Sequence, residues 1–206
     1  MVITRKPYSV AGFFAREHGL NGLQALLMAK DFEVTSVFTH RKKPRSEDPE
    51  RGERDDFSKY ESICKLHSIP LFAIDTKSET PKIFDALEKD PPDLLAVISW
   101  RMLIGKDILE LPRFGGINLH RGELPRYKGG LPILRALEDG QDRICISAHL
   151  LTEEIDGGEL IEEVWHPVNY IQTQSLAADV ERLKKEITPL FGPILLKALR
   201  RIVSDE

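Results

Sequence analysis

Two polar residues of complementary chemistry stand two positions apart in the middle of the chain. Asn118 and His120 belong to the short run Ile117–His120, which predicts a strand. Side chains alternate along a strand, so both would leave the same face, while Leu119 would point into packing. Taken alone, such a pair is more often a hydrogen-bonded edge pair. An amide beside an imidazole is also able to stabilise an oxyanion, which makes the pair a candidate for acyl transfer.

A carboxylate followed by two glycines lies 36 positions after His120 (156 − 120). Asp156 precedes Gly157 and Gly158, and glycines permit tight turns and close approach of a ligand. An isolated Asp-Gly-Gly run usually marks only a turn. A helix and a strand between His120 and Asp156 would return the chain to the same edge of a sheet. The carboxylate would then hold the imidazole charged or take up the proton that an attacking amine loses.

Short apolar runs alternate with helical patterns along the chain, which predicts βα units. We expect one α/β domain over residues 1–206, with a Rossmann-like, mostly parallel sheet and helices on both faces. The expected strands are Tyr8–Ala15, Glu33–Thr39, Pro70–Asp75, Asp93–Trp100, Ile117–His120, Ile144–Leu151 and Leu160–Pro167. The expected helices are Leu23–Lys30 after a loop over Arg16–Gly22, Thr80–Glu88, Leu131–Glu138, and an amphipathic helix from Ser175, bent or broken at Pro189 and Pro193.

The segment His40–Tyr60 consists almost entirely of charged residues, proline and glycine. Its positive and negative charges nearly cancel, which favours a solvated, mobile loop. Its beginning has a second interpretation. Four cations fall within Arg41–Arg45, directly after an expected strand end, and such a cluster suits a phosphate-bearing ligand at the carboxyl edge of the sheet.

The run NLHRGELPRYKGG, followed by AHLLTEEIDGGELI, resembles the catalytic core of the 10-formyltetrahydrofolate-dependent formyltransferases. That family includes glycinamide ribonucleotide, methionyl-tRNA and sugar N-formyltransferases, and its pattern is Asn-x-His, Leu-Pro-x-(Tyr/Phe)-x-Gly and Asp-x-Gly. The clear resemblance covers about Asp93 to Asn169. It implies an N-formyltransferase with the formyltransferase fold, in which 10-formyltetrahydrofolate is the co-substrate and no metal takes part. Asn118, His120 and Asp156 would be the catalytic residues.

The resemblance also implies where the two substrates bind. The pterin of the folate would lie against two loops, at Trp100, Met102, Leu103, Ile104, Leu151, Thr152, Glu153 and Ile155, although core packing explains Met102, Leu103 and Ile104 equally well. The acceptor would contact His40, Arg41, Lys42, Tyr127 and Lys128. Many members have Pro-Ser after the catalytic histidine, whereas this chain has Arg121-Gly122. That departure concerns acceptor contacts more than the chemistry.

The identity of the acceptor amine is left open by the motifs. Phe38-Thr39-His40-Arg41 and Tyr127-Lys128-Gly129 look like sugar N-formyltransferases, so we favour a nucleotide-linked amino sugar. Glycinamide ribonucleotide is the alternative, because its enzymes are similarly short. The segment His18–Gln24 resembles their phosphate-gripping turn, although it lacks the serine of that turn.

Composition and charge narrow the classes of partner and of function that the chain could have. A formal net charge of −4 argues against a nucleic-acid partner, and the end at Glu206 leaves no room for the C-terminal domain of methionyl-tRNA formyltransferases. No apolar run approaches the roughly 18 residues of a membrane span, so we expect a cytoplasmic protein with small-molecule substrates. The oligomeric state stays open, a homodimer included. A non-catalytic nucleotide-binding module is a further alternative, whereas a dehydrogenase lacks support because only Gly19 and Gly22 follow the first expected strand.

Overall fold

Seven strands form one sheet in the computed structural model, which describes residues 6–170 and 175–204. The strand order is β3-β2-β1-β4-β5-β6-β7. Pairing is parallel from β3 to β5 and antiparallel from β5 to β7. The strands are β1 (Tyr8–Phe14), β2 (Phe32–Thr39), β3 (Leu71–Ala73), β4 (Leu94–Ile98), β5 (Gly116–His120), β6 (Arg143–Leu150) and β7 (Leu160–Pro167).

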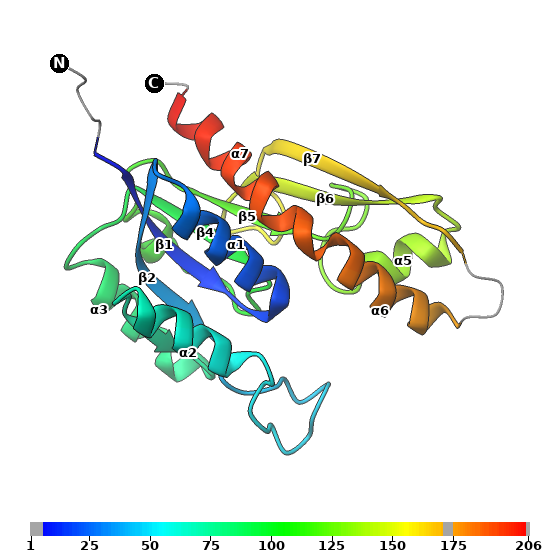
Figure 1. Cartoon of the computed structure of the whole chain (residues 1–206), viewed down its shortest axis with the longest axis horizontal. Helices are drawn as coiled ribbons and strands as arrows, with labels where there is room; N and C mark the ends of the chain where they lie inside the picture. The colour runs from blue at the N-terminus through cyan, green and yellow to red at the C-terminus, as the bar shows by residue number, and fades with distance from the viewer. Residues whose placement is uncertain (1–5, 171–174, 205–206) are drawn as a thin grey trace.

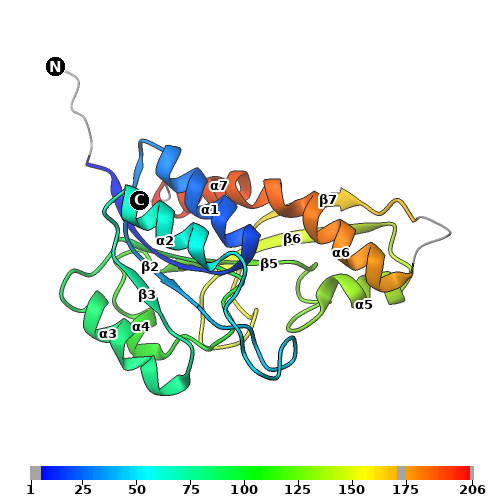
Figure 2. The ribbon, with the colours of Figure 1, turned by 60° about the horizontal axis from the view of Figure 1, so that its bottom comes forward.

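Helices cover both faces of the sheet, as Figures 1 and 2 show. One face carries α1 (Arg16–Met28), α2 (Phe57–Leu66) and α7 (Phe191–Ser204). The other carries α3 (Pro81–Leu87) and α4 (Lys106–Leu109), while α5 (Pro132–Glu138) packs against α6 (Leu176–Ile187). Two short 3₁₀ helices complete the elements, η1 (Lys77–Glu79) and η2 (Thr188–Leu190). The predicted α/β class with a mostly parallel sheet is therefore confirmed.

The hydrophobic core lies in two layers, one on each face of the sheet. All five residues of β4 are buried, as its two-sided apolar sequence predicts for a central strand. The larger cluster joins the sheet to α1 and α7, and the smaller joins it to α3 and α4. Within the described residues, no helix is long and apolar enough to span a membrane. Removal of this apolar surface from water holds the strand ends in fixed positions.

Helix α1 begins at Arg16, so the loop predicted over Arg16–Gly22 is wrong. Gly22 suggested a loop by its type, but it sits inside the helix because α1 packs closely on the sheet. A Cβ atom at Gly22 would come within 2.4 Å of the side chain of Ile98 on β4. The glycine here permits contact between two elements rather than a turn.

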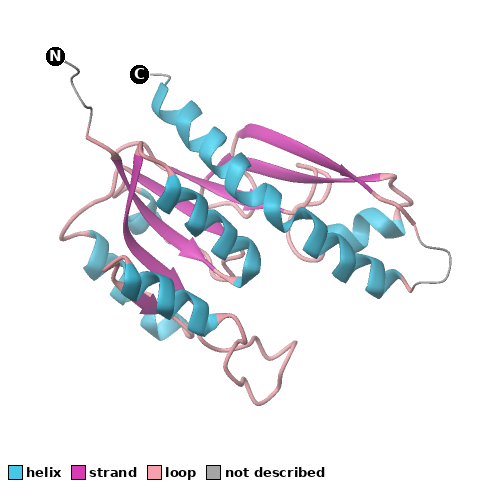
Figure 3. Cartoon of the chain, in the orientation of Figure 1, coloured by secondary structure: helices cyan, strands magenta, loops and turns pink. Residues whose placement is uncertain are grey.

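Two other regions differ from the sequence-based expectation. The long loop after β2 ends in α2, which the charge pattern concealed (Figure 3). Arg54 and Asp56 in that loop form a buried bidentate ion pair, with N–O distances of 2.9 and 2.7 Å, so the segment is anchored rather than wholly solvated. Near the C-terminus, η2 interrupts the helix at Pro189 as predicted. Pro193 causes no break, because it lies in the first turn of α7, where proline is tolerated.

Candidate functional site

Asn118, His120 and Asp156 converge at the carboxyl end of β5. The Nδ1 atom of His120 lies 3.2 Å from Oδ2 of Asp156. The Nδ2 atom of Asn118 donates a hydrogen bond to Oδ1 of Asp156 at 3.1 Å. The backbone N–H of Gly129 donates to Oδ2 at 2.8 Å. One carboxylate therefore joins β5, the loop that follows β5, and the loop 151–159 between β6 and β7.

The loop 151–159 brings Asp156 to this place by folding back over the sheet. The expected helix and strand, α5 and β6, lie between His120 and Asp156, and β6 runs antiparallel to β5. Gly158 passes so close to the backbone of Leu150 that a Cβ atom would lie 1.9 Å from its carbonyl oxygen. Asp156 itself adopts a φ of +48°, a region that non-glycine residues seldom occupy. The position of the carboxylate thus depends on an unusually tight loop.

His149 is a fourth member of the cluster, which the sequence analysis missed. It pairs with Asn118 across β5 and β6, and its Nε2 atom lies 2.9 Å from the Asn118 amide nitrogen. Its Nδ1 atom lies 2.9 Å from the carbonyl oxygen of Leu150, which only accepts, so Nδ1 carries the proton and Nε2 accepts from Asn118. A polar histidine within the apolar strand predicted over Ile144–Leu151 was the available signal.

The two ring nitrogens of His120 both face oxygen atoms. Nε2 donates to the carbonyl oxygen of Tyr127 at 2.7 Å, and Nδ1 faces the Asp156 carboxylate. Burial lowers the pKa of His120 below its ordinary value, and the opposing effects of Asp156 and the Tyr127 carbonyl do not compensate. The expectation that the carboxylate holds this imidazole charged is therefore wrong, because Asp156 raises the pKa by less than burial lowers it. The side chain is only 9% exposed, and its lost hydration outweighs the nearby charge.

The carboxyl group of Asp156 has a pKa below its ordinary value despite its burial. Burial opposes ionisation, but contact with His149, the proximity of His120 and the backbone N–H of Gly129 together outweigh it. The carboxylate is therefore ionised near neutral pH. It offers a fixed negative charge beside the imidazole.

A cavity of about 200 Å³, which we call the β4-side cavity, opens next to this cluster. Asn118, His149 and Asp156 line its inner end. Its walls come from the segment after β4 and from loop 151–159. The predicted pterin contacts Trp100, Met102, Leu103, Ile104, Leu151, Thr152 and Ile155 all line it. Glu153 does not line it, whereas Arg101 and Glu154 do.

Two large apolar side chains at the β4-side cavity are unusually exposed. Leu103 is 68% exposed and Ile155 is 58% exposed. Beneath them, Trp100 stacks on His40 with ring centroids 4.1 Å apart and meets Phe13 edge-on at 5.2 Å. The cavity therefore combines an aromatic floor with apolar groups that lack cover.

A larger cavity of about 810 Å³, the α1-side cavity, lies between the start of α1, the loop after β2, α6 and the residue that follows His120. Its cations come from all four segments and include Arg16, Lys43, Arg121 and Lys184. The N-terminus of α1 faces it without any side-chain cap, because the N-cap residue is Ala15. Uncapped helix N-termini attract anions.

His18, on the first turn of α1, also lines the α1-side cavity and is 6% exposed. Its Nε2 atom lies 3.2 Å from the carbonyl oxygen of Lys184, and its Nδ1 atom has no hydrogen-bond partner within the described part of the chain. Burial, aided by Arg121 and Lys184, lowers the pKa of His18 to about 3. His18 is therefore neutral and contributes no charge to this cavity.

The structure separates the three predicted acceptor contacts at the end of β2. His40 is buried, and its Nδ1 atom donates to the carbonyl oxygen of Ile74 at 2.6 Å. Burial lowers the pKa of His40 to about 3, so it is not a cation. Arg41 lies over the ring of Phe57 and pairs with acidic residues, and Lys42 is exposed. None of these three lines the α1-side cavity, whereas the next residue, Lys43, does.

The two predicted acceptor contacts after β5 already have partners within the protein. Tyr127 is buried, and its hydroxyl donates to Asp139 at 2.9 Å. Its backbone carbonyl, rather than its side chain, contacts His120. Lys128 forms an ion pair with Glu154 at 2.9 Å and so bridges the loops on either side of Asp156. Substrate binding by both residues stays a prediction.

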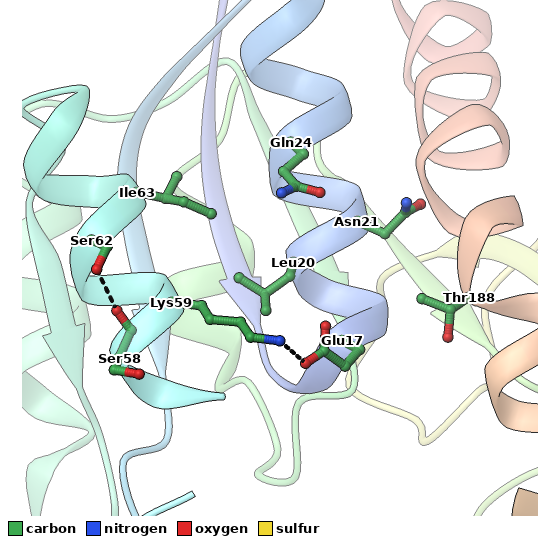
Figure 4. A pocket seen from close by; sticks show the side chains of 9 residues that line it. All are labelled: Glu17, Leu20, Asn21, Gln24, Ser58, Lys59, Ser62, Ile63 and Thr188. Carbon is green, nitrogen blue, oxygen red and sulfur yellow. Dashed lines mark hydrogen bonds and ion pairs between the residues drawn. The ribbon is translucent and has the colours of Figure 1, made fainter. Parts of the chain in front are cut away.

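A third cavity of about 510 Å³ lies between α1, α2 and η2 and adjoins the α1-side cavity (Figure 4). The two cavities share Glu17, Lys59 and Thr188. Glu17 and Lys59 form an ion pair at 2.6 Å across the boundary. We call this third cavity the α2 cavity. No group of three or more metal-ligating side chains occurs among the residues that the structure describes.

Residues 13–189 match the sequence model of the formyl transferase family. The chain is 26% identical over 176 residues to the methionyl-tRNA formyltransferase of Thermotoga maritima, covering 85% of this chain and 53% of that protein. A second relative, the methionyl-tRNA formyltransferase of Aromatoleum aromaticum, is 29% identical to this chain. The alignment covers 99% of this chain and 61% of that protein. The chain thus spans little more than half the length of these curated relatives.

Solved structures share the fold over nearly the whole chain. The phosphoribosylglycinamide formyltransferase of Bacillus halodurans superposes with a TM-score of 0.71 at 21% identity, covering 95% of both chains. The formyltetrahydrofolate deformylase of Pseudomonas syringae gives a TM-score of 0.74 at 17% identity, covering 98% of this chain and 63% of that one. At these identities the likeness concerns the fold alone.

Proposed function

The chain belongs to the formyl transferase family, and from that premise we propose that it transfers a formyl group from 10-formyltetrahydrofolate to a primary amine. One observation carries the proposal. Asn118, His120 and Asp156 meet at the end of β5. Asn118 and Asp156 line the β4-side cavity, and Arg121, the residue after His120, lines the charged α1-side cavity. Two substrates of different chemistry would approach the cluster from opposite sides.

The folate supplies the formyl carbon, and transfer of that carbon to an amine forms a new C–N bond and releases tetrahydrofolate. Negative charge develops on the formyl oxygen, where an N–H of Asn118 would stabilise it. The single N–H of neutral His120 would join it by leaving the carbonyl oxygen of Tyr127. Both N–H groups of Asn118 are engaged by His149 and Asp156 in the ligand-free protein. One of these bonds would therefore be exchanged for the formyl oxygen. Asp156, ionised near neutral pH, would accept the proton that the amine loses and return a proton to the folate nitrogen as the bond between that nitrogen and the formyl carbon breaks.

The β4-side cavity suits the pterin of the folate. A flat, partly apolar ring needs apolar cover and a few polar groups that fix its orientation. Leu103 and Ile155 offer apolar surface that no protein atom covers, and loop 151–159 offers backbone groups beside it. Folate binding would also bring the formyl group to Asn118, which lines the same cavity.

The α1-side cavity suits an acceptor that carries phosphate. Five acidic side chains line the cavity beside six Lys and Arg side chains, so an anion would bind at the cations that lack an acidic partner and at the uncapped start of α1. Within that class we favour a nucleotide-linked amino sugar, because the adjoining α2 cavity extends the site. A ligand in two parts, sugar and nucleoside, would use both cavities, whereas a single ribose phosphate would use one.

Two other acceptors have specific support. Glycinamide ribonucleotide is favoured by the phosphoribosylglycinamide formyltransferases that share the fold over most of this chain, whose names specify that acceptor. Methionyl-tRNA is favoured by the curated relatives, whose names specify that substrate. The expectation that no nucleic acid takes part finds no support in those relatives. A tRNA acceptor therefore belongs in any test.

The test is a turnover assay with 10-formyltetrahydrofolate and each acceptor class in turn. Release of tetrahydrofolate with an amino-sugar nucleotide, with little release for glycinamide ribonucleotide or methionyl-tRNA, is the expected result. His120→Gln is the control for enzymatic origin. The general proposal is overturned if the wild-type protein neither binds 10-formyltetrahydrofolate nor formylates any of the three acceptors. A preference for another acceptor would overturn only the choice of sugar nucleotide.

A further inference from the structure

Arg121 occupies a position that links the catalytic cluster to the α1-side cavity. It follows His120 directly, at the end of β5. Alternation along the chain directs its side chain away from the face that carries His120. The side chain is half-buried and lines the α1-side cavity. Arg121 is therefore the cation of that cavity nearest in the chain to the reacting centre.

Arg121 differs from most other cations of the cavity wall in lacking a partner among the described residues, a property that it shares with Lys185. Arg121 makes no hydrogen bond or ion pair with any residue in the ranges 6–170 and 175–204. Lys185 lines the cavity too, but is exposed to solvent. The remaining cations are held by acidic side chains, in the pairs Arg16–Glu47, Lys43–Asp55, Lys59–Glu17 and Lys184–Glu181.

The charge of Arg121 is only partly compensated. A guanidinium stays protonated in proteins, so burial is not relieved by loss of the proton. Burial lowers the pKa of Arg121, the nearby Arg16 lowers it further, and the more distant charges of Glu181 and Glu47 oppose the shift. A half-buried guanidinium with free donors matches the geometry of a phosphate group, which accepts two parallel hydrogen bonds.

We propose that Arg121 anchors a phosphate of the acceptor and thereby determines which amines this site accepts. That the phosphate-bearing ligand is an amine rests on the proposed function. Because His120 and Arg121 are consecutive, an anchored phosphate lies at a set separation from the catalytic histidine. The site therefore selects amines that carry a phosphate or pyrophosphate at a matching separation, and it discriminates against the same amines without one.

The first experiment measures anion binding and does not depend on turnover. Inorganic pyrophosphate is titrated into the wild-type protein, Arg121→Ala, Arg121→Lys and Arg126→Ala by calorimetry. Arg126 is the matched control, because it lies on the same loop but is exposed and pairs with Asp139. We expect Arg121→Ala to weaken binding about 10-fold or more and Arg126→Ala to leave it unchanged.

Arg121→Lys retains the charge and most of the volume, so it tests the role of the guanidinium even if the alanine variant folds poorly. It should bind pyrophosphate with intermediate affinity, because an ammonium group lacks the two-pronged geometry. Equal affinity in wild type, Arg121→Ala and Arg121→Lys overturns the assignment. So does the absence of pyrophosphate binding by the wild-type protein at millimolar concentrations.

The second experiment compares steady-state constants for an amino sugar with and without its nucleoside diphosphate. In Arg121→Ala, the KM for the nucleotide-linked amine should rise at least about 10-fold, and added guanidinium should partly restore it. The KM for the folate should not change. Wild-type turnover with an unchanged acceptor KM in Arg121→Ala overturns the role of Arg121. Absence of all wild-type turnover contradicts the proposed function, and the pyrophosphate titration still decides the anion site.

Discussion

The two cavities beside β5 are built in opposite ways. The β4-side cavity is formed by the segment after β4 and by loop 151–159, and its uncovered groups, Leu103 and Ile155, are apolar. The α1-side cavity collects charged side chains from α1, the loop after β2, α2, α6 and the end of β5. One cavity offers apolar contact from two segments, and the other offers charge from five.

Because of this difference, one side of the site would recognise its ligand by apolar contact and the other by charge. Apolar burial varies little with salt, whereas attraction between partly exposed charges weakens as ionic strength rises. The proposed catalytic cluster lines the β4-side cavity through Asn118 and Asp156 and adjoins the α1-side cavity through Arg121, so both substrates would meet there. Substitutions in the three regions should therefore give three different kinetic signatures, and each signature tests the comparison.

The largest effect is expected in the catalytic cluster. His120→Gln or Asp156→Asn should lower kcat by ~10²-fold or more, because each removes a group that stabilises charge or moves a proton. Both KM values should stay nearly constant, since the cluster touches each substrate only at the reacting atoms. Steady-state assays with each substrate varied in turn provide the measurement. A variant that keeps near wild-type kcat would remove its residue from the catalytic role.

The second effect belongs to the β4-side cavity. The double substitution Leu103→Ala with Ile155→Ala should raise the KM for 10-formyltetrahydrofolate ~10-fold, because apolar cover of the pterin is lost. Both residues are exposed, so the melting temperature should hardly change. Leu66→Ala on α2 is the matched control, since Leu66 is 78% exposed and outside both cavities. A rise in the acceptor KM instead would contradict the division of the site.

The third effect concerns the cations after β2. From the sequence alone, joint replacement of Arg41, Lys42 and Lys43 with alanine is expected to raise the KM for the acceptor and to leave the KM for the folate unchanged. Within this triple variant, Lys43→Ala alone should account for the change, roughly 3-fold at low salt, because only Lys43 lines the α1-side cavity. Arg41→Ala serves as the control. If Arg41→Ala has the larger effect on the acceptor KM, the loop rearranges when ligand binds, and the observed cavity is not the acceptor site.

The last effect is on stability in acid rather than on kinetics, and it concerns His40. Burial holds the pKa of His40 near 3, below the ordinary value of 6.5, so between these values the unfolded chain takes up a proton that the folded protein does not. The free energy of unfolding should therefore fall as pH falls below about 6.5, by up to ~1.4 kcal/mol per pH unit. His40→Gln should reduce that slope, even though it lowers stability at pH 7 through loss of the stack on Trp100. Denaturant titrations at several pH values measure the slope, and an unchanged slope would place the proton uptake elsewhere.

Sequence motifs predicted the centre of the site better than its surroundings. Asn118, His120 and Asp156 were recognisable because strand alternation and an Asp-Gly-Gly loop constrain them locally. Most predicted pterin contacts line one cavity, since they flank those motifs in the chain. His149 was missed because its contact with Asn118 depends on the register of an antiparallel pair. That register is a property of the folded sheet rather than of neighbouring residues.

The α1-side cavity could not be predicted from local sequence patterns. Residues such as Arg16 and Lys184 come from segments 168 positions apart (184 − 16), and only the packing of α1 against the C-terminal helices unites them. Conversely, His40 looked like a surface group because charged residues follow it, yet β2 ends beneath Trp100 and buries it. At this strand end, Lys43 lines the α1-side cavity, whereas the predicted acceptor contacts His40, Arg41 and Lys42 do not.

Because the two cavities are formed by different segments, their structure also affects how the acceptor specificity of such a protein changes during evolution. The segments that supply most of the charge around the α1-side cavity carry no member of the catalytic cluster, so mutation there leaves the reacting geometry intact. Loop 151–159 has no such freedom, because it holds Asp156 as well as the β4-side wall. Selection is therefore able to exchange one acceptor for another while the folate side is retained.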